Sequence, residues 1–180
     1  MTTEELNFLE QSNYIEQEYG HEAFDDAVIA WQFAKEVVDD ELRGLSVGAI
    51  LHIHKLLLEN LNPRIAGRLR DCAVWIGGRY CPVELPFALI QKLQNWIDLC
   101  YNNEEVSEKE AHVRFEQLHP FEDGNGRVGR ILMNMQRLKR KKPILIIHEG
   151  AEQMEYYKWF NEEASFSKKS GRKVQYQDKT

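Results

Sequence analysis

Apolar residues recur every three or four positions along most of this 180-residue chain, a spacing that predicts amphipathic helices. The clearest case covers residues 22–38. A second helix follows Ser46, whose hydroxyl suits an N-cap, and runs to about Leu61. Ser107 and Glu110 have the spacing of a capping box, which predicts a helix from there to Leu118. The same periodicity places the remaining helices at about 87–101, 125–138 and 151–163.

One segment departs from this helical spacing. Residues 72–84 place β-type side chains around Gly77-Gly78, which indicates a β-hairpin. We therefore expect an all-α fold, a compact bundle of about six to eight helices with one β-hairpin. A single domain is expected over 1–165, followed by a basic, flexible tail over 166–180.

Composition narrows the class of protein. Hydrophobic residues make up 43% of the chain, enough for a core, and no apolar run approaches the ~18 residues of a membrane span. The N-terminus lacks the basic and apolar stretches of a signal peptide, and three cysteines leave one unpaired. We expect reduced thiols in a cytoplasmic protein.

The charge of the chain indicates which classes of partner it can bind. The net charge of −6 argues against a protein that coats nucleic acid. A basic cluster at 137–142 is typical of the cationic C-terminal end of a helix, because the helix dipole favours cations there. A nucleic-acid interaction through this cluster is the alternative interpretation.

The segment that carries chemistry is His-Pro-Phe-Glu-Asp-Gly-Asn-Gly-Arg-Val-Gly-Arg, residues 119–130. Pro120 disfavours the right-handed α conformation at His119, so the preceding helix should end there and present the imidazole on a loop. Gly124 and Gly126 allow the backbone to turn with positive φ. Successive N–H groups in such a turn, at the start of a helix, form an anion-binding site.

The charged residues of this segment point to a phosphate. Arg127 and Arg130 lie one turn apart near a helix N-terminus, where each cation is disfavoured by roughly 0.3–1 kcal/mol unless an anion is bound. Asp123 is suited to hold a divalent cation against phosphate oxygens. His119, with an ordinary pKa near ~6.5, is suited to accept a proton from a hydroxyl.

The run Phe-Glu-Gln-Leu followed by residues 119–130 resembles the Fic family signature, His-x-Phe-x-(Asp/Glu)-Gly-Asn-Gly-Arg-x-x-Arg, at every defined position. The resemblance extends to Gly67 and Arg70, to the hairpin residues 75–79 (the family's flap) and to Tyr156-Tyr157. It implies the Fic fold and a protein adenylyltransferase. Such an enzyme moves AMP from ATP to a Ser, Thr or Tyr hydroxyl of a protein, itself included, and releases pyrophosphate.

The resemblance also implies a role for each residue. His119 would be the general base, and Asp123 would hold Mg²⁺ or Mn²⁺ against the phosphates of ATP. Tyr156 would contact the adenosine end. The other nucleotide-binding residues would be Ile76, Gly77, Gly78 and Arg79 in the flap, and Gly124, Asn125, Gly126, Arg127, Val128, Gly129 and Arg130 in the signature.

A second motif lies upstream, on a helix expected over about 3–17. Ser12 and Glu16 are similar to the family's inhibitory motif, (Ser/Thr)-x-x-x-Glu-(Gly/Asn), in the N-terminal position that defines class II. Glu16 would inhibit the enzyme by pairing with Arg130, which the terminal phosphate needs. Gln17 departs from the Gly or Asn of the pattern. The same glutamate could position a water for removal of AMP, so de-AMPylation is a further candidate.

Several functions within and outside this class stay open. A Fic relative could use another nucleotide or phosphoryl donor, although Gly126 and Arg130 favour AMP transfer. A regulatory module that binds ATP without transfer is the alternative from the binding class, and the intact His119 and Asp123 argue against it. A second copy of the chain is a further candidate partner.

Overall fold

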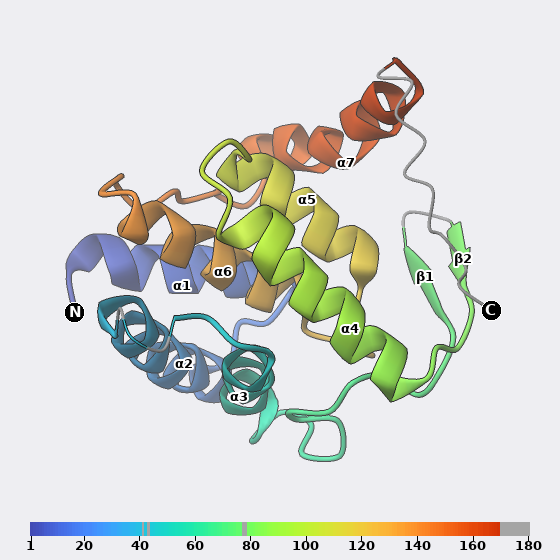
Figure 1. Ribbon diagram of the computed structural model, residues 1–180. Helices are drawn as coiled ribbons and strands as arrows, with labels where there is room; N and C mark the ends of the chain where they lie inside the picture. Colours follow the sequence, from blue (N-terminus) through green and yellow to red (C-terminus); the bar gives the residue numbers. More distant parts are fainter. Residues whose placement is uncertain (41, 43, 77–78, 170–180) are drawn as a thin grey trace.

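The computed structural model describes residues 1–40, 42, 44–76 and 79–169 (Figure 1). Within these ranges the all-α prediction is confirmed, with seven α-helices, one π-helical turn and one two-stranded hairpin. The helices are α1 (Thr3–Ile15), α2 (His21–Asp39), α3 (Val47–Leu58), α4 (Pro86–Trp96), α5 (Glu108–Leu118), α6 (Asn125–Lys139) and α7 (Ala151–Lys169). The π-helical turn is η1 (Ile97–Tyr101), and the strands are β1 (Val74–Ile76) and β2 (Arg79–Cys81).

Two predicted helix starts are confirmed by their caps. The Ser46 hydroxyl accepts from the Ala49 N–H at 3.1 Å, and the Ser107 hydroxyl accepts from the Glu110 N–H at 3.1 Å. The Glu110 carboxylate pairs with Arg114, which lies one turn further along α5, instead of turning back to complete a capping box.

Three predicted helix ends are wrong. The helix expected over about 3–17 ends at Ile15, because the backbone turns left-handed at Gln17 with φ +62°. The helix expected to reach Leu61 ends at Leu58. The last helix continues to Lys169 instead of 163, so the tail expected from residue 166 does not begin there. Residues 170–180 lie outside the described residues, and for them the flexible tail stays a prediction.

The helix expected over 87–101 is not a continuous α-helix. It changes to the π form at Ile97, where the Asn102 N–H donates to the Ile97 carbonyl at 2.9 Å. The carbonyls of Cys100 and Tyr101 accept from the buried Gln136 side chain at 3.2 and 2.9 Å. Carbonyls at the end of a helix have no intrahelical donor, so Gln136 satisfies these two through a long-range contact that apolar spacing does not reveal.

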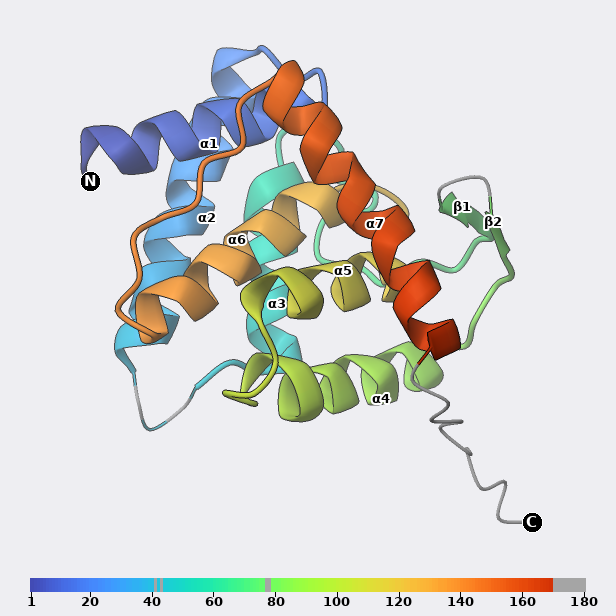
Figure 2. The same ribbon diagram turned by 90° about the horizontal axis from the view of Figure 1, so that it is seen from above.

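Helix α6 is the central element. It contacts α1, α2, α3 and α5, and α7 lies across α5 (Figures 1 and 2). Every residue from 127 to 136 is buried, so α6 is covered on all sides in its middle. Because buried cations need partners, Arg127 and Arg130 can be kept on this helix only by anionic or polar groups from neighbouring elements.

The hairpin stands at the edge of the helical body (Figure 1). Its strands are antiparallel, with Val74 opposite Cys81 and Trp75 opposite Tyr80. The side chain of Trp75 is 70% exposed, and its ring contacts the exposed Tyr80 ring edge-on at 5.4 Å. The two rings contact each other on the exposed surface of the hairpin.

No helix in the described part of the chain is both long and apolar enough to cross a bilayer.

Candidate active site

His119 caps the C-terminus of α5 with φ +47° and ψ 64°, so the predicted exit from right-handed helix is confirmed. Its Nδ1 lies 3.2 Å from the Glu116 carbonyl oxygen. Because a carbonyl oxygen only accepts, Nδ1 carries the proton and Nε2 keeps its lone pair. Burial lowers the pKa of His119, the Glu116 carbonyl opposes this, and the charge of Arg70 lowers the pKa further. The imidazole is therefore neutral at pH 7 and able to accept a proton at Nε2.

A second histidine, His54, binds the loop that follows His119. The Gly67 N–H donates to Nδ1 of His54 at 3.0 Å, so Nε2 carries the proton and donates to the Asp123 carbonyl at 3.1 Å. The Phe121 ring stacks on His54 with centroids 3.8 Å apart and planes 3° apart. Burial lowers the pKa of His54 to about 4, so this ring stays neutral at pH 7 and has a structural role.

The two signature glycines have different roles. Gly124 has φ +77° and forms the N-cap of α6, which confirms its predicted positive φ. Gly126 lies inside α6 without positive φ, so that part of the prediction is wrong. A Cβ on Gly126 would lie 2.2 Å from Glu16 Oε1 and 3.0 Å from Arg130 Nη1. The absence of a side chain there provides the space for the carboxylate of Glu16.

Asn125 holds the loop through its side chain. The Phe121 N–H donates to Asn125 Oδ1, and Asn125 Nδ2 donates to the Phe121 carbonyl, both at 3.0 Å. The residue is 3% exposed. Any contribution of Asn125 to phosphate binding is therefore left to its backbone N–H.

The side chains of Asp123 and Arg127 contact each other at the N-terminus of α6. The Asp123 carboxylate is 61% exposed, accepts from the Gly124 N–H at 2.6 Å and lies 3.4 Å from Arg127 Nη2. Arg127 itself is 3% exposed, and its buried Nε has no hydrogen-bond partner among the described residues. This cation is incompletely satisfied, which fits a site that takes an anion.

Backbone donors lie beside these side chains. The Val128 N–H donates to the Gly124 carbonyl at 3.0 Å, so the N–H groups of residues 125–127 precede the first intrahelical bond. An N-terminus of this kind attracts phosphate. With an exposed carboxylate at its edge, the donor set also fits a divalent cation held between Asp123 and phosphate oxygens.

Val128 and Gly129 face the interior of the protein. Val128 is fully buried in the main core cluster. A Cβ on Gly129 would lie 2.4 Å from Glu116 Oε1 and 2.8 Å from His112 Cε1. These two positions support the packing of α6, and their predicted nucleotide contacts stay predictions.

Arg130 is 2% exposed and is held by α1. Its Nη2 donates to Glu16 Oε1 at 2.6 Å and to the Ser12 carbonyl at 2.8 Å, and its Nε donates to Ser12 Oγ at 2.9 Å. Glu16 therefore lies at the cation predicted for it, and Ser12 binds the same cation, a contact that was not predicted.

Tyr156 lies behind Arg130. It is 3% exposed, and its hydroxyl lies 2.8 Å from His112 Nε2 and 3.5 Å from Arg130 Nη1. Its ring centroid is 5.9 Å from the guanidinium carbon of Arg130. Tyr156 thus supports Arg130, and its predicted contact with the adenosine end stays a prediction.

Two buried polar residues of α5 were missed by sequence reasoning. Glu116 Oε1 and His112 Nδ1 are buried without a hydrogen-bond partner among the described residues, and both face Gly129. Burial raises the pKa of Glu116 to about 8 and lowers that of His112 to about 3. Their spacing, one helical turn apart directly before the signature, is the signal that could have identified them.

The flap is only partly described. Gly77 and Gly78 lie outside the described residues. Ile76 and Arg79 are paired across the hairpin by their backbones, and their side chains also lie outside the description. The predicted nucleotide contacts of these four residues stay predictions.

Comparison with known families identifies this arrangement. The Fic/DOC family model matches residues 44–136, which include α3, the hairpin and the whole signature. The chain belongs to the Fic/DOC family. A protein adenylyltransferase, fic-1 of Caenorhabditis elegans, is 32% identical over 109 residues, covering 57% of this chain and 21% of the relative. The protein adenylyltransferase Fic of Drosophila erecta is 30% identical over 121 residues, covering 63% and 23%. The chain therefore spans under a quarter of the length of these two relatives.

Solved structures show the same fold. A Fic-domain signalling protein from Bacteroides thetaiotaomicron superposes with a TM-score of 0.68 at 21% identity, covering 87% of this chain and 69% of the other. Residues 134–508 of C. elegans Fic-1 give a TM-score of 0.61 at 20% identity, covering 93% and 58%. The Fic fold thus includes helices outside the region that the family model matches.

Proposed function

We propose that this Fic protein is an adenylyltransferase that transfers AMP from ATP to a Ser, Thr or Tyr hydroxyl of a protein. The observation that carries the proposal is that two groups lie within nine residues at the N-terminus of α6: His119, whose Nε2 accepts no hydrogen bond from the described residues, and Arg127, whose buried Nε has no partner among them. The first is suited to a hydroxyl, and the second to a polyphosphate. The family membership and the names of the relatives support the same reaction class.

In the proposed reaction, His119 Nε2 takes the proton of the acceptor hydroxyl. The hydroxyl oxygen forms a bond to the α-phosphorus of ATP, the bond from that phosphorus to the bridging oxygen breaks, and pyrophosphate leaves. Arg127 and the N–H groups of residues 125–127 would bind the phosphates. Asp123 would hold Mg²⁺ or Mn²⁺, which when bound neutralises phosphate charge and favours the leaving of pyrophosphate.

We also propose that α1 inhibits the enzyme in cis. Arg130 is the cation one turn further into α6, and the terminal phosphate of ATP is its natural ligand. Glu16 and Ser12 take three of its donor positions at 2.6–2.9 Å. A triphosphate in the productive pose would have to displace Glu16, since a second anion cannot share that position without strong repulsion.

Intact-mass spectrometry after incubation with Mg·ATP tests both statements. We expect Glu16→Gly to acquire an AMP adduct, and the double variant Glu16→Gly/His119→Ala to acquire none, because loss of a positioned base costs ~10²–10⁴-fold in rate. Glu18→Gly is the matched control, since it changes a glutamate two residues away that lies beyond α1.

Other outcomes of this measurement identify the rival functions. An adduct of different mass from a mixture of nucleotides would indicate another donor. ATP binding without any adduct, in the presence of added protein acceptors, would indicate a regulatory module and contradict the proposed reaction.

A further inference from the structure

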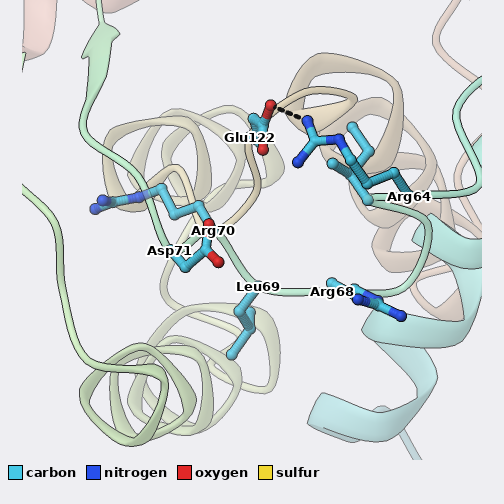
Figure 3. Close-up of a pocket in the computed structure, with 7 residues that line it drawn as sticks. Arg64, Arg68, Leu69, Arg70, Asp71 and Glu122 are labelled. Carbon is cyan, nitrogen blue, oxygen red and sulfur yellow. Dashed lines mark hydrogen bonds and ion pairs between the residues drawn. The ribbon is translucent and has the colours of Figure 1, made fainter.

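Arg70 lies in the loop between α3 and β1 and is 2% exposed. Three arginines of this loop, Arg64, Arg68 and Arg70, line a small pocket. The guanidinium of Arg70 points away from the other two (Figure 3). It enters the interior of the protein between the catalytic loop and the base of the hairpin. A buried guanidinium is costly unless its donors are satisfied, so its partners indicate what it does.

One side of Arg70 binds the catalytic loop. Its Nε donates to the His119 carbonyl at 2.9 Å, and its backbone N–H donates to the Pro120 carbonyl at 2.9 Å. These are consecutive carbonyls at the point where the chain adopts the left-handed conformation. Such a conformation costs a non-glycine residue roughly 1–2 kcal/mol, so His119 needs outside contacts to hold it.

The other side of Arg70 binds both ends of the hairpin. Its Nη1 donates to the Cys72 carbonyl, before β1, at 3.1 Å and to the Pro82 carbonyl, after β2, at 2.8 Å. Its Nη2 pairs with Glu84 Oε1 at 2.9 Å. The planar fork of an arginine fixes such partners relative to one another, which the single ammonium of a lysine does not.

We propose that Arg70 is a positioning residue that fixes the hairpin to the catalytic loop and thereby sets the acceptor hydroxyl of the target against His119 Nε2. This rests on the proposed function, and it takes the hairpin as the element that aligns the target, because the edge of a two-stranded sheet can pair with an extended peptide segment. The hairpin projects from the helical body (Figure 1), so its position depends on ties at its base. The positive charge of Arg70 also favours the neutral form of His119, in agreement with the lowered pKa of that residue.

The two sides of Arg70 can be separated by mutation. Arg70→Gln removes the side-chain bonds on both sides and leaves only the backbone N–H of Arg70 on Pro120. Glu84→Gln leaves the bond of Arg70 to the His119 carbonyl in place, and weakens the contacts of Glu84 with Arg70 and with Lys92. Arg70→Lys keeps the charge and loses the fork. Arg68→Gln is the matched control, since it removes a neighbouring arginine that points away from Arg70 (Figure 3).

Hydrogen exchange measured by mass spectrometry tests the tie itself, independently of any activity. We expect Arg70→Gln to speed exchange in both 72–84 and 119–124, Glu84→Gln to speed it in 72–84 alone, and Arg68→Gln to change neither segment. If Arg70→Gln leaves either segment at the wild-type rate, Arg70 does not link them and the proposal is overturned. Because this readout needs no transfer, it separates failure of the proposal from failure of the proposed function.

Transfer rates in the Glu16→Gly background test the positioning role. We expect Arg70→Gln to lower single-turnover AMP transfer at least ~10-fold, because misplacement by about 1 Å costs up to ~10²-fold, with the Kd of Mg·ATP unchanged within about twofold. Arg70→Lys should fail to restore the rate. The double variant Arg70→Gln/Glu84→Gln should be no slower than Arg70→Gln, since both changes break one linkage.

Two results would overturn the positioning role. One is full transfer activity in Arg70→Lys, which would mean that only the charge matters. The other is multiplication of the Arg70 and Glu84 effects in the double variant, which would mean that the residues act separately. If Arg70→Gln does not fold, Arg70→Lys and Glu84→Gln decide the matter alone.

Discussion

Glu116 places a carboxyl oxygen in the interior beside Gly129, where no described group binds it. Burial raises its pKa to about 8, with Arg130 acting against this and Glu16 adding to it. At pH 7 the carboxyl is therefore mostly protonated. A neutral Glu116 leaves Glu16 as the anion that pairs with Arg130 in the inhibited state.

This position predicts a pH dependence of stability. Between the ordinary value of 4.5 and the folded value of about 8, the unfolded chain releases the Glu116 proton and the folded chain keeps it. The free energy of unfolding therefore falls as pH rises through this window, by about 1.4 kcal/mol for each unit of pKa difference. Glu116→Gln removes that fall, so we expect the variant to gain stability relative to wild type between pH 5 and pH 8.

Urea unfolding at pH 5 and pH 8 measures the effect. Glu110→Gln is the matched control, because Glu110 lies on the same helix with its carboxylate paired to Arg114 near solvent. If wild type and Glu116→Gln lose or gain stability in parallel over this range, Glu116 is ionised in the folded protein and the argument fails.

The sequence predicted the residues of the site better than their individual roles. His119, Asp123 and Arg127 are brought together as expected, because they lie within nine residues around one loop. The further roles of the Asn125 side chain and of Gly126 were not foreseen, because they depend on contacts with Phe121 and with Glu16. Arg70 was noted only for its resemblance to the family, since its partners other than Cys72 lie 12 to 50 residues away in the sequence.

At the scale of elements, the end of α1 determines where Glu16 lies. The Gln17 N–H donates to the Tyr14 carbonyl at 2.9 Å and the Glu18 N–H to the Asn13 carbonyl at 3.0 Å. This is a Schellman motif with Gln17 at the left-handed position, φ +62°, where glycine or asparagine is usual. Gln17 stands where the family's pattern has Gly or Asn. This substitution therefore leaves the turn in place and adds backbone strain.

We accordingly expect Gln17→Gly to stabilise the end of α1 by about 1 kcal/mol, the usual penalty of a side chain in the left-handed region. Because the turn is then less strained, it should hold Glu16 against Arg130 more firmly, and the basal rate of AMP transfer should fall. Thermal unfolding and the automodification rate measure the two effects, with Gln11→Gly, inside the helix, as a control that should destabilise. A Gln17→Gly protein that is less stable than wild type would show that the turn does not carry this strain.

Elements with strong periodicity were predicted closely, and those governed by distant contacts were not. The bounds of α2 and α6 lie within one residue of the apolar pattern. Gln136, 35 residues beyond Tyr101, binds the carbonyls at the end of the π-helical turn, and α1 ends at a turn with a glutamine in the left-handed conformation. Neither leaves a local signal in apolar spacing.

At the scale of the whole molecule, α1, α6 and α7 meet at Arg130. Glu16 from α1 and Tyr156 from α7 both contact its guanidinium. If Glu16 and a nucleotide phosphate compete for Arg130, the coupling is reciprocal: release of Glu16 strengthens nucleotide binding by the same factor as nucleotide binding favours release. The competition therefore has a signature in stability as well as in activity.

In the His119→Ala background, which prevents transfer, we expect Glu16→Gly to lower the Tm of the free protein by a few degrees. The loss is about 1–3 kcal/mol, less than for a fully buried pair because Glu16 is 33% exposed. Saturating Mg·ATP should then raise the Tm of Glu16→Gly more than that of the parent, since the phosphate replaces the missing carboxylate on Arg130. A tenfold gain in affinity corresponds to about 1.4 kcal/mol.

Differential scanning calorimetry over a series of Mg·ATP concentrations measures both shifts, and Glu18→Gly is again the control with a parent-like response. Arg130→Gln adds the decisive comparison, because without the guanidinium the Glu16→Gly change should no longer alter the ATP-induced shift. Equal ATP-induced shifts in the parent and in Glu16→Gly would mean that ATP binds without contesting Arg130. The ion pair would then be a structural contact between α1 and α6, and inhibition in cis would have no physical basis at this site.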